Sequence, residues 1–182
     1  GAIRMCKRIL KNQTNKNGGI PFYKIGSFGG ETDNYISQEL FDEYRNKYPY
    51  PNKGDLLISA AGTIGKIVVF DGEPSYFQDS NIVWLDNDNS ILSNHYLYYL
   101  YQTIEWKVST GGTIARLYNS AIASQKVVIP NSLSEQHRIA DILDKFNALA
   151  TSLIDGLPAE IELRQKQYEY YRDQLLTFKQ KH

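Results

Sequence analysis

Short apolar runs separated by glycine- and proline-rich turns fill the first 130 positions of the chain. The run at 20–25 predicts a strand, which ends in the turn-rich sequence 26–30. Further strands are predicted at residues 55–59, 66–70, 81–85 and 126–129. The last of these stops at Pro130 and is predicted to be a buried strand that closes the domain.

Helical spacing marks two shorter segments of the same region. Ser37 is predicted to cap a short helix, because serine side chains accept hydrogen bonds from the first turn. The apolar residues of that helix are Leu40, Phe41 and Tyr44. A second helix is predicted at 93–106 from the spacing of Leu97, Leu100, Tyr101 and Ile104. Strands and helices in this order predict an α+β domain with a mixed sheet over residues 1–130.

Residues 131–182 have a helical pattern throughout, and we predict a C-terminal helical arm. Between 139 and 154 the apolar residues recur every three or four positions and form one stripe. A break is predicted at 156–158, where glycine and proline stand. Beyond this break, seven residues are spaced alternately four and three positions apart. They form a heptad seam in which one residue is charged and the others are apolar or aromatic. The seam consists of Leu157, Ile161, Arg164, Tyr168, Tyr171, Leu175 and Phe178.

The arm has two interpretations. Both helical patterns can fold back and complete the core of the chain's own domain, which explains the first stripe well. The seam is not needed to complete the core of a domain that already has core strands, so it favours contact with a partner. Arg164 on the seam would be costly in a dry interface unless it is paired, and it is a candidate for setting the register of that contact.

Charge is balanced over the chain but uneven along it. Twenty lysines and arginines offset twenty acidic residues, so the net charge is zero. Residues 1–30 nevertheless hold six bases and no acid: Arg4, Lys7, Arg8, Lys11, Lys16 and Lys24. Such a patch suits a polyanion, although a solvated face is an equally good interpretation on charge alone.

Composition excludes several kinds of site. The single cysteine, Cys6, rules out an internal disulfide and a cysteine-built metal centre. The three histidines show no metal-ligand spacing, and no nucleophile motif is present, so we expect a binding protein without metal rather than an enzyme. No apolar run is long enough to span a membrane, and we expect a cytoplasmic protein. The chain begins with Gly1 in sequence that looks structured, so we expect either a missing natural N-terminus or a cloning remnant.

Two loops carry candidate ligand-binding residues. The segment 60–67 is superficially like a phosphate loop, but it lacks the leading glycine and the hydroxyl after the lysine. We therefore predict a tight turn between strands, with Thr63 and Lys66 as surface donors. In the segment 111–118, paired glycines permit close approach of a ligand to the backbone. Its donors are Thr113, Arg116 and Tyr118, and a flexible hairpin with one surface arginine remains the alternative.

The order of these segments resembles one half of a Type I restriction–modification DNA specificity subunit. The resemblance covers nearly the whole chain, and only the combination of its parts is specific. The similar segments are residues 54–59, 111–117, 129–130, 133–136, 139–144, 156–161 and 164–171.

The resemblance implies a non-catalytic subunit that reads double-stranded DNA. Full-length members carry two target-recognition domains, held apart by helical regions that pack as an antiparallel coiled-coil spacer, and each domain reads half of a split site. They recruit a methyltransferase subunit, which binds S-adenosylmethionine, and a nuclease/translocase subunit. The DNA-contact candidates then become Arg4, Lys7, Arg8, Lys11, Lys24, Thr63, Lys66, Thr113, Arg116 and Tyr118.

This chain has one recognition domain where the family has two. We therefore expect a head-to-tail homodimer through the C-terminal helices, which restores two domains. A fragment of a longer subunit is the other interpretation of the same observation. The competing function is a protein scaffold that associates through the helices and does not bind DNA.

Overall fold

The computed structural model describes the backbone of residues 1–109 and 115–176, and the side chains of those residues up to 149. Five later side chains are also described, those of Glu160, Leu163, Lys166, Gln167 and Tyr170. The chain forms two compact units, Gly1–His137 and Arg138–His182. The sequence placed the division between residues 130 and 131, whereas the first unit includes the first turn of the long C-terminal helix.

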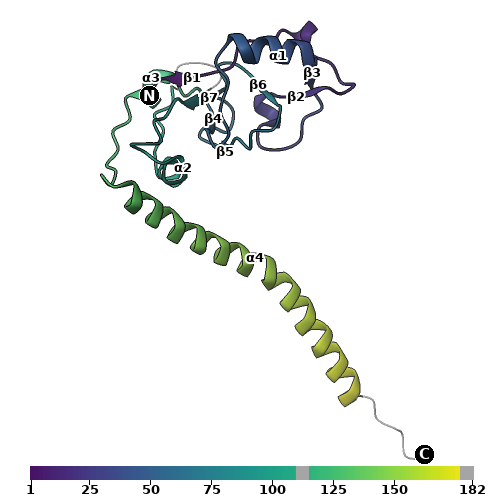
Figure 1. Cartoon of the computed structure of the whole chain (residues 1–182). Helices are drawn as coiled ribbons and strands as arrows, with labels where there is room; N and C mark the ends of the chain where they lie inside the picture. Colours follow the sequence, from purple (N-terminus) through teal and green to yellow (C-terminus); the bar gives the residue numbers. More distant parts are fainter. Residues whose placement is uncertain (110–114, 177–182) are drawn as a thin grey trace, which may run out of the picture. The chain divides into compact units, whose positions relative to one another are not determined.

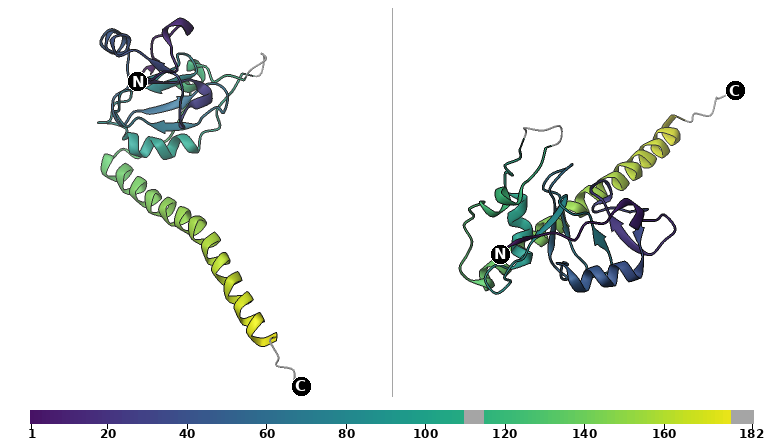
Figure 2. Two further views of the ribbon diagram at one scale, coloured as in Figure 1. Left: turned by 90° about the vertical axis from the view of Figure 1, so that its right-hand side faces the viewer. Right: turned by 90° about the horizontal axis from the view of Figure 1, so that it is seen from above.

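The first unit contains two sheets (Figures 1 and 2). The four-stranded sheet is antiparallel, in the order β1 (Ile3–Arg4), β7 (Ile82–Leu85), β4 (Leu56–Ser59), β5 (Ile67–Val69). The three-stranded sheet has the order β3 (Tyr35–Ile36), β2 (Ile20–Tyr23), β6 (Tyr76–Phe77). In it β2 runs antiparallel to β3 and parallel to β6, which confirms the mixed sheet.

The four-stranded sheet is covered on both faces. Side chains alternate along a strand, so Leu57 of β4 packs in one apolar cluster while Leu56 and Ile58 pack in another. In the same way Trp84 and Val83 of β7 point to opposite clusters. All four residues of β4 are buried. This explains why its first three residues, Leu56 to Ile58, are all apolar rather than alternating with polar ones.

The first apolar cluster joins the two sheets to helix α1 (Gln38–Lys47). Ser37 caps the helix as predicted, since its Oγ accepts a hydrogen bond from the Leu40 N–H at 3.2 Å. Phe41 is the buried residue of the helix, and its ring meets those of Tyr50 and Tyr76 edge-on at 5.6 and 6.5 Å between centroids. Aromatic packing therefore fixes α1 to the body.

The second cluster joins the four-stranded sheet to α2 (Asn94–Gln102) and α3 (Asn119–Ala123). Helix α2 is shorter than the predicted 93–106. Ile104 and Trp106 still pack against the cluster, but from an irregular segment. Because both are apolar and stand at helical spacing, the sequence pattern predicted a helix longer than α2. Trp106 lies against the loop between β4 and β5, where a Cβ on Gly65 would come within 2.7 Å of its indole ring.

The turn predicted at 60–65 is confirmed as the connection between β4 and β5. Gly62 and Gly65 adopt φ of 66° and 82° there, in the left-handed region. Replacing Gly65 by alanine is expected to destabilise the first unit by about 1–3 kcal/mol, from backbone strain and from the clash with Trp106. Thermal unfolding followed by circular dichroism measures this. Gly26→Ala is the control, because that glycine has no atom within 4 Å of an added Cβ and no positive φ; equal loss of stability in both variants would contradict the prediction.

The strand predicted at 126–129 is wrong. These residues have no regular structure and pair with no strand in the described part of the chain. Val128 is 94% exposed and Val127 is 41% exposed, so the segment is a surface connection. Its β-branched residues have strand propensity, but an extended segment becomes a strand only when a neighbouring strand offers hydrogen bonds.

Helix α4 (Leu133–Leu176) begins after a short connection that follows Pro130. The break predicted at 156–158 is wrong for the backbone, which is helical through all three residues. A proline inside a helix removes one hydrogen bond and favours a kink, and this does not require the helix to end. The short elements β1, β3, β6 and α3 were not predicted, because two to five residues are too few to show a period.

Candidate nucleic-acid interface

A groove of about 580 Å³ opens on the first unit. It is lined by residues of the segments 8–14 and 78–81, by Phe22 and Lys24, and by Arg116. These parts are far apart in the sequence. The fold thus brings four of the predicted DNA-contact residues to one place: Arg8, Lys11, Lys24 and Arg116.

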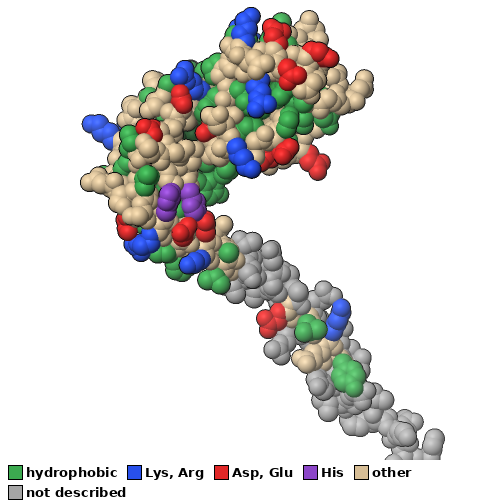
Figure 3. All heavy atoms as spheres, in the orientation of Figure 1, with side chains coloured by type: hydrophobic (Ala, Val, Ile, Leu, Met, Phe, Trp, Pro, Cys, Tyr) green, Lys and Arg blue, Asp and Glu red, His purple; other side chains and the backbone are tan. Residues whose placement is uncertain are grey.

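The groove is cationic although the chain is neutral. Its described lining holds four basic residues and one acidic residue, Asp79. Basic and acidic side chains are interspersed on the face of the first unit drawn in Figure 3. A concave surface with an excess of one charge concentrates ligands of the opposite charge. The groove therefore suits a polyanion such as the DNA backbone.

Backbone hydrogen bonds to Ala60 connect two of the groove-lining parts, although Ala60 itself does not line the groove. The Ala60 N–H donates to the Asn81 carbonyl at 2.7 Å, and the Ala60 carbonyl accepts from the Leu117 N–H at 2.9 Å. Ala60 follows β4 directly, so the end of this central strand lies between the segment 78–81 and the segment that carries Arg116. Arg116 also forms an antiparallel bridge with Ala61. The position of Arg116 is thereby tied to the sheet.

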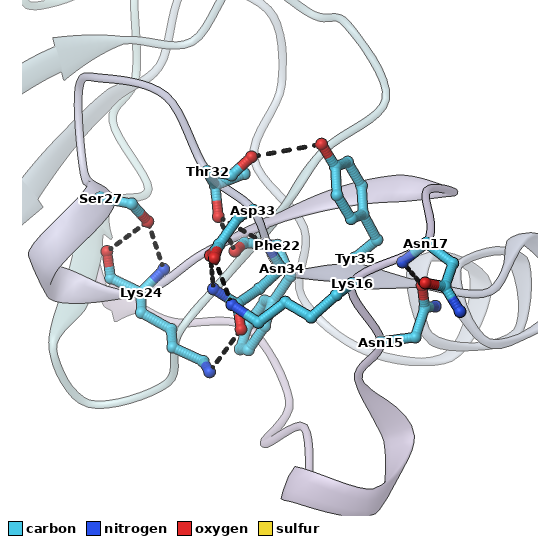
Figure 4. A network of polar contacts seen from close by, with 10 residues as sticks. All are labelled: Asn15, Lys16, Asn17, Phe22, Lys24, Ser27, Thr32, Asp33, Asn34 and Tyr35. Atoms are coloured by element: carbon cyan, nitrogen blue, oxygen red, sulfur yellow. Dashed lines mark hydrogen bonds and ion pairs between the residues drawn. The ribbon is translucent and has the colours of Figure 1, made fainter.

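Lys24 is positioned by a polar network at the end of β2 (Figure 4). Its Nζ donates to the Asn34 Oδ1 at 2.8 Å, and the Asn34 Nδ2 donates to the Asp33 Oδ1 at 2.7 Å. Asp33 also pairs with Lys16 at 2.5 Å. The hydrogen bond from Lys16 holds the pKa of the Asp33 carboxyl below its ordinary value. This chain of contacts restricts the ammonium group of Lys24 to the edge of the groove.

Arg8 is held by the acidic residue of the groove. Its Nε donates to the Asp79 Oδ2 at 2.9 Å. The Asp79 side chain is 16% exposed, whereas that of Arg8 is 68% exposed. The carboxylate is therefore part of the wall, and the guanidinium extends from it toward solvent.

Five other predicted contact residues lie outside the groove lining. Arg4 pairs with Asp86 at 3.1 Å, and the Lys7 Nζ lies 5.1 Å from the centroid of the Tyr48 ring. The Lys66 Nζ donates to the Phe28 carbonyl at 2.6 Å, so this lysine stabilises the loop that contains Phe28. The remaining two, both exposed, are Thr63 in the β4–β5 turn and Tyr118 before α3. Thr113 lies outside the described residues.

The heptad seam lies outside the described side chains. The backbone of α4 is helical from Leu157 to Leu175, and Phe178 lies beyond the described residues. Earlier on the same helix, Ile142, Phe146 and Leu149 are exposed by 37%, 65% and 61% within the second unit. Their spacing of four and three places them on one face. This apolar face belongs to the first stripe of the sequence pattern.

Sequence reasoning missed the segment 78–81 and the role of Gln136. The side chain of Gln136 is fully buried, and its Oε1 accepts from the Ser93 N–H at 2.8 Å. Its Nε2 donates to the carbonyls of Ile91 and Pro130 at 3.0 and 2.9 Å. Gln136 thereby fastens the first turn of α4 to the start of α2. Periodicity cannot reveal this role, because a polar residue on a helix is normally expected at the surface.

Nothing described in the first unit suggests an activated nucleophile. Cys6 is 2% exposed, and burial raises the pKa of its thiol to about 12, which leaves it protonated at neutral pH. Among the described residues, no helix is both long and apolar enough to cross a membrane.

The fold and the groove together define a class of protein. It is an α+β domain with a cationic groove on one side, whose chain continues into a long helix. Such a groove on a neutral protein points to binding of a negatively charged polymer.

Comparison with known proteins identifies the family. The sequence model of the type I restriction modification DNA specificity domain matches residues 1–163. The chain therefore belongs to this family, as its sequence pattern predicted. It is 61% identical over 178 residues to a protein of Haemophilus influenzae named as a type I restriction enzyme specificity subunit. The match covers 98% of this chain and 46% of that relative, so the chain spans less than half of its length.

Solved structures share the fold. A chain from a study of complex assembly and conformational transition in a type I R-M system has a TM-score of 0.64 and 24% identity, over 92% of this chain and 40% of that one. The S subunit of a type I system from M. genitalium has a TM-score of 0.54 and 19% identity, over 94% of this chain and 42% of that one. The predicted α+β fold with a C-terminal helical region is confirmed.

Proposed function

We propose that this chain reads one half of a split double-stranded DNA site for a type I restriction–modification complex. The cationic groove carries the proposal, because it gathers Arg8, Lys11, Lys24 and Arg116 in a domain of the specificity family. Lysines and arginines at such a surface neutralise phosphates and release counterions. The names of the relatives support a role in target choice.

In this proposal the chain performs no chemistry. Methylation and cleavage belong to the methyltransferase and nuclease/translocase subunits that it recruits. S-adenosylmethionine binds to the methyltransferase subunit, and the chain itself needs no cofactor. The described groove offers hydrogen-bond donors and positive charge, which serve recognition.

The proposal is tested by mapping modified adenines in a host that carries this chain with its methyltransferase. We expect one methylated motif that depends on the chain. Exchanging residues 20–125 for those of a relative with another target is expected to change that motif. A motif that persists after the exchange would contradict the proposal. A chain that associates with the methyltransferase but binds no DNA alongside it would instead be a protein scaffold.

Replacing Arg116 by alanine is expected to weaken DNA binding by about 5- to 10-fold at 0.1 M salt, because one phosphate contact is lost. Titration of a labelled duplex with the chain and its methyltransferase measures this. Equal loss for cognate and random duplexes assigns Arg116 to phosphate, and a selective loss for the cognate duplex assigns it to a base. Unchanged binding to both would remove Arg116 from the interface.

We further propose that two copies associate head to tail through their C-terminal helices. A dimer restores the two recognition domains of a full-length subunit and predicts a palindromic split site. The exposed apolar face formed by Ile142, Phe146 and Leu149 supports a partner on this helix. The seam from Leu157 to Phe178 extends the predicted contact.

Light scattering at tens of micromolar is expected to give about twice the chain mass of 20.8 kDa. Replacing Phe146 and Leu149 by glutamate is expected to shift the equilibrium at least 10-fold toward monomer, because two carboxylates would be buried without partners. Glutamate at Ala148, an exposed position on another face, is the control and is expected to leave the dimer intact. A wild-type monomer at this concentration would contradict the proposal.

A further inference from the structure

The segment 78–81, which joins β6 to β7 in the wall of the groove, has an unusual backbone. Ser80 adopts a φ of 60°, and it is the one non-glycine residue in the described part of the chain with a positive φ. L-residues with a side chain enter the left-handed region rarely, and those that do concentrate at functional sites. Glycine occupies the other positive-φ positions of the described chain, so a serine at this position calls for an explanation.

The next residue adds a second unusual feature. The Oδ1 of Asn81 is buried and accepts no hydrogen bond from any described residue. Buried polar atoms nearly always have partners, and one that lacks a partner often belongs to a site that is completed by a ligand. Rotation of the amide about its last side-chain bond exchanges Oδ1 with Nδ2. Asn81 can therefore change which group it presents without moving the backbone.

The third feature is the arginine held by this segment. Asp79 accepts a hydrogen bond from the Nε of Arg8, and in the described part of the chain the two terminal nitrogens of the guanidinium donate none. Guanine presents two acceptors, O6 and N7, at spacing that matches this pair of donors. A guanidinium already fixed by a carboxylate loses less side-chain entropy when it binds. The two lysines of the groove, Lys11 and Lys24, are point charges that suit phosphates.

We propose that Arg8, positioned by Asp79, reads a guanine edge in the DNA major groove, and that the segment 79–81 is the specificity-determining part of the groove. This inference rests on the proposed DNA-recognition function. It assigns different roles to two sets of groove residues. Arg8 and its turn discriminate between base pairs, whereas Lys11, Lys24 and Arg116 hold the phosphate backbone and bind sequences alike.

The test uses the full chain with its methyltransferase and a duplex that carries the mapped methylation site. In further duplexes each guanine–cytosine pair of one half-site is replaced in turn by adenine–thymine. Arg8→Lys keeps the positive charge but removes the pair of guanidinium donors. We therefore expect about 10- to 100-fold weaker binding to the mapped duplex. Binding to a scrambled duplex is expected to change by less than about 2-fold. Discrimination at one guanine position is expected to disappear.

Asp79→Asn is expected to reduce discrimination at the same guanine, and the double variant is expected to be no worse than Arg8→Lys alone. A merely structural role for Asp79 would instead lower the melting temperature and weaken binding to every duplex. The matched controls are Arg45→Lys and Asp42→Asn, the same exchanges at exposed residues of α1 that do not line the groove. These controls are expected to keep the wild-type discrimination.

The inference is overturned if Arg8→Lys keeps the wild-type discrimination at every position, or if the mapped half-site contains no guanine–cytosine pair. A wild-type complex without a methylation motif and without DNA affinity would overturn the proposed function itself. The two failures are therefore distinguishable.

Discussion

Replacing Gln136 by alanine is expected to lower the free energy of unfolding of the first unit by about 3 kcal/mol. The substitution removes three hydrogen bonds from a fully buried side chain and leaves the Ser93 N–H and the carbonyls of Ile91 and Pro130 without their partner. Each buried group left unpaired costs about 1–3 kcal/mol, and entry of water into the vacated space offsets part of the sum. For a unit of this size the melting temperature should fall by roughly 10 °C.

Differential scanning calorimetry measures this loss. The matched control is Gln102→Ala, because Gln102 is exposed on α2 and donates one hydrogen bond of 3.3 Å to the Tyr98 carbonyl within its own helix. Its loss is expected to change stability by less than about 0.5 kcal/mol. If Gln136→Ala melts together with the control, the anchoring role assigned to this side chain is incorrect.

Removing the three phosphate-type cations of the groove, by Lys11→Ala, Lys24→Ala and Arg116→Ala together, is expected to weaken DNA binding about 500-fold at 0.1 M salt. Each neutralised phosphate contributes a factor of about 8 at this salt concentration through counterion release. The slope of log affinity against log salt should become less negative by about 2.7, for cognate and random duplexes alike.

Binding titrations at several salt concentrations, with the methyltransferase present, measure both quantities. The control carries the same change of net charge at three exposed lysines that do not line the groove: Lys47, Lys53 and Lys126. It is expected to retain most of the affinity, since charges distant from the duplex are screened. Equal slopes for the two triple variants would show that the groove is not where the phosphates bind.

Much of the fold could be predicted because its core elements carry local signals. The paired runs that become β4 and β5, and the serine that caps α1, are each recognisable within ten residues of sequence. The error at 126–129 has the opposite origin. Strand propensity is local, but the hydrogen bonds that make a strand come from another segment. No strand of the described sheets pairs with residues 126–129.

The candidate site could be predicted only in part. Excess positive charge in residues 1–30 was visible in the sequence, and Arg8, Lys11 and Lys24 do line the groove. That Arg116 joins them depends on backbone contacts of residues 116–117 with the end of β4, which no spacing reveals. The contribution of Asp79 was also hidden, because an acidic residue in a turn is normally a solvated charge.

The backbone contacts of Ala60 have a consequence for engineering new target preferences. Its N–H and carbonyl join the segment 78–81 and residues 116–117 to one strand end, so these parts share a single alignment. Grafting one of them alone onto another scaffold would place its side chains against mismatched neighbours. Transplants that keep residues 60–117 as one block preserve that alignment, and libraries that vary only the side chains of Arg8, Asp79 and Asn81 leave it untouched.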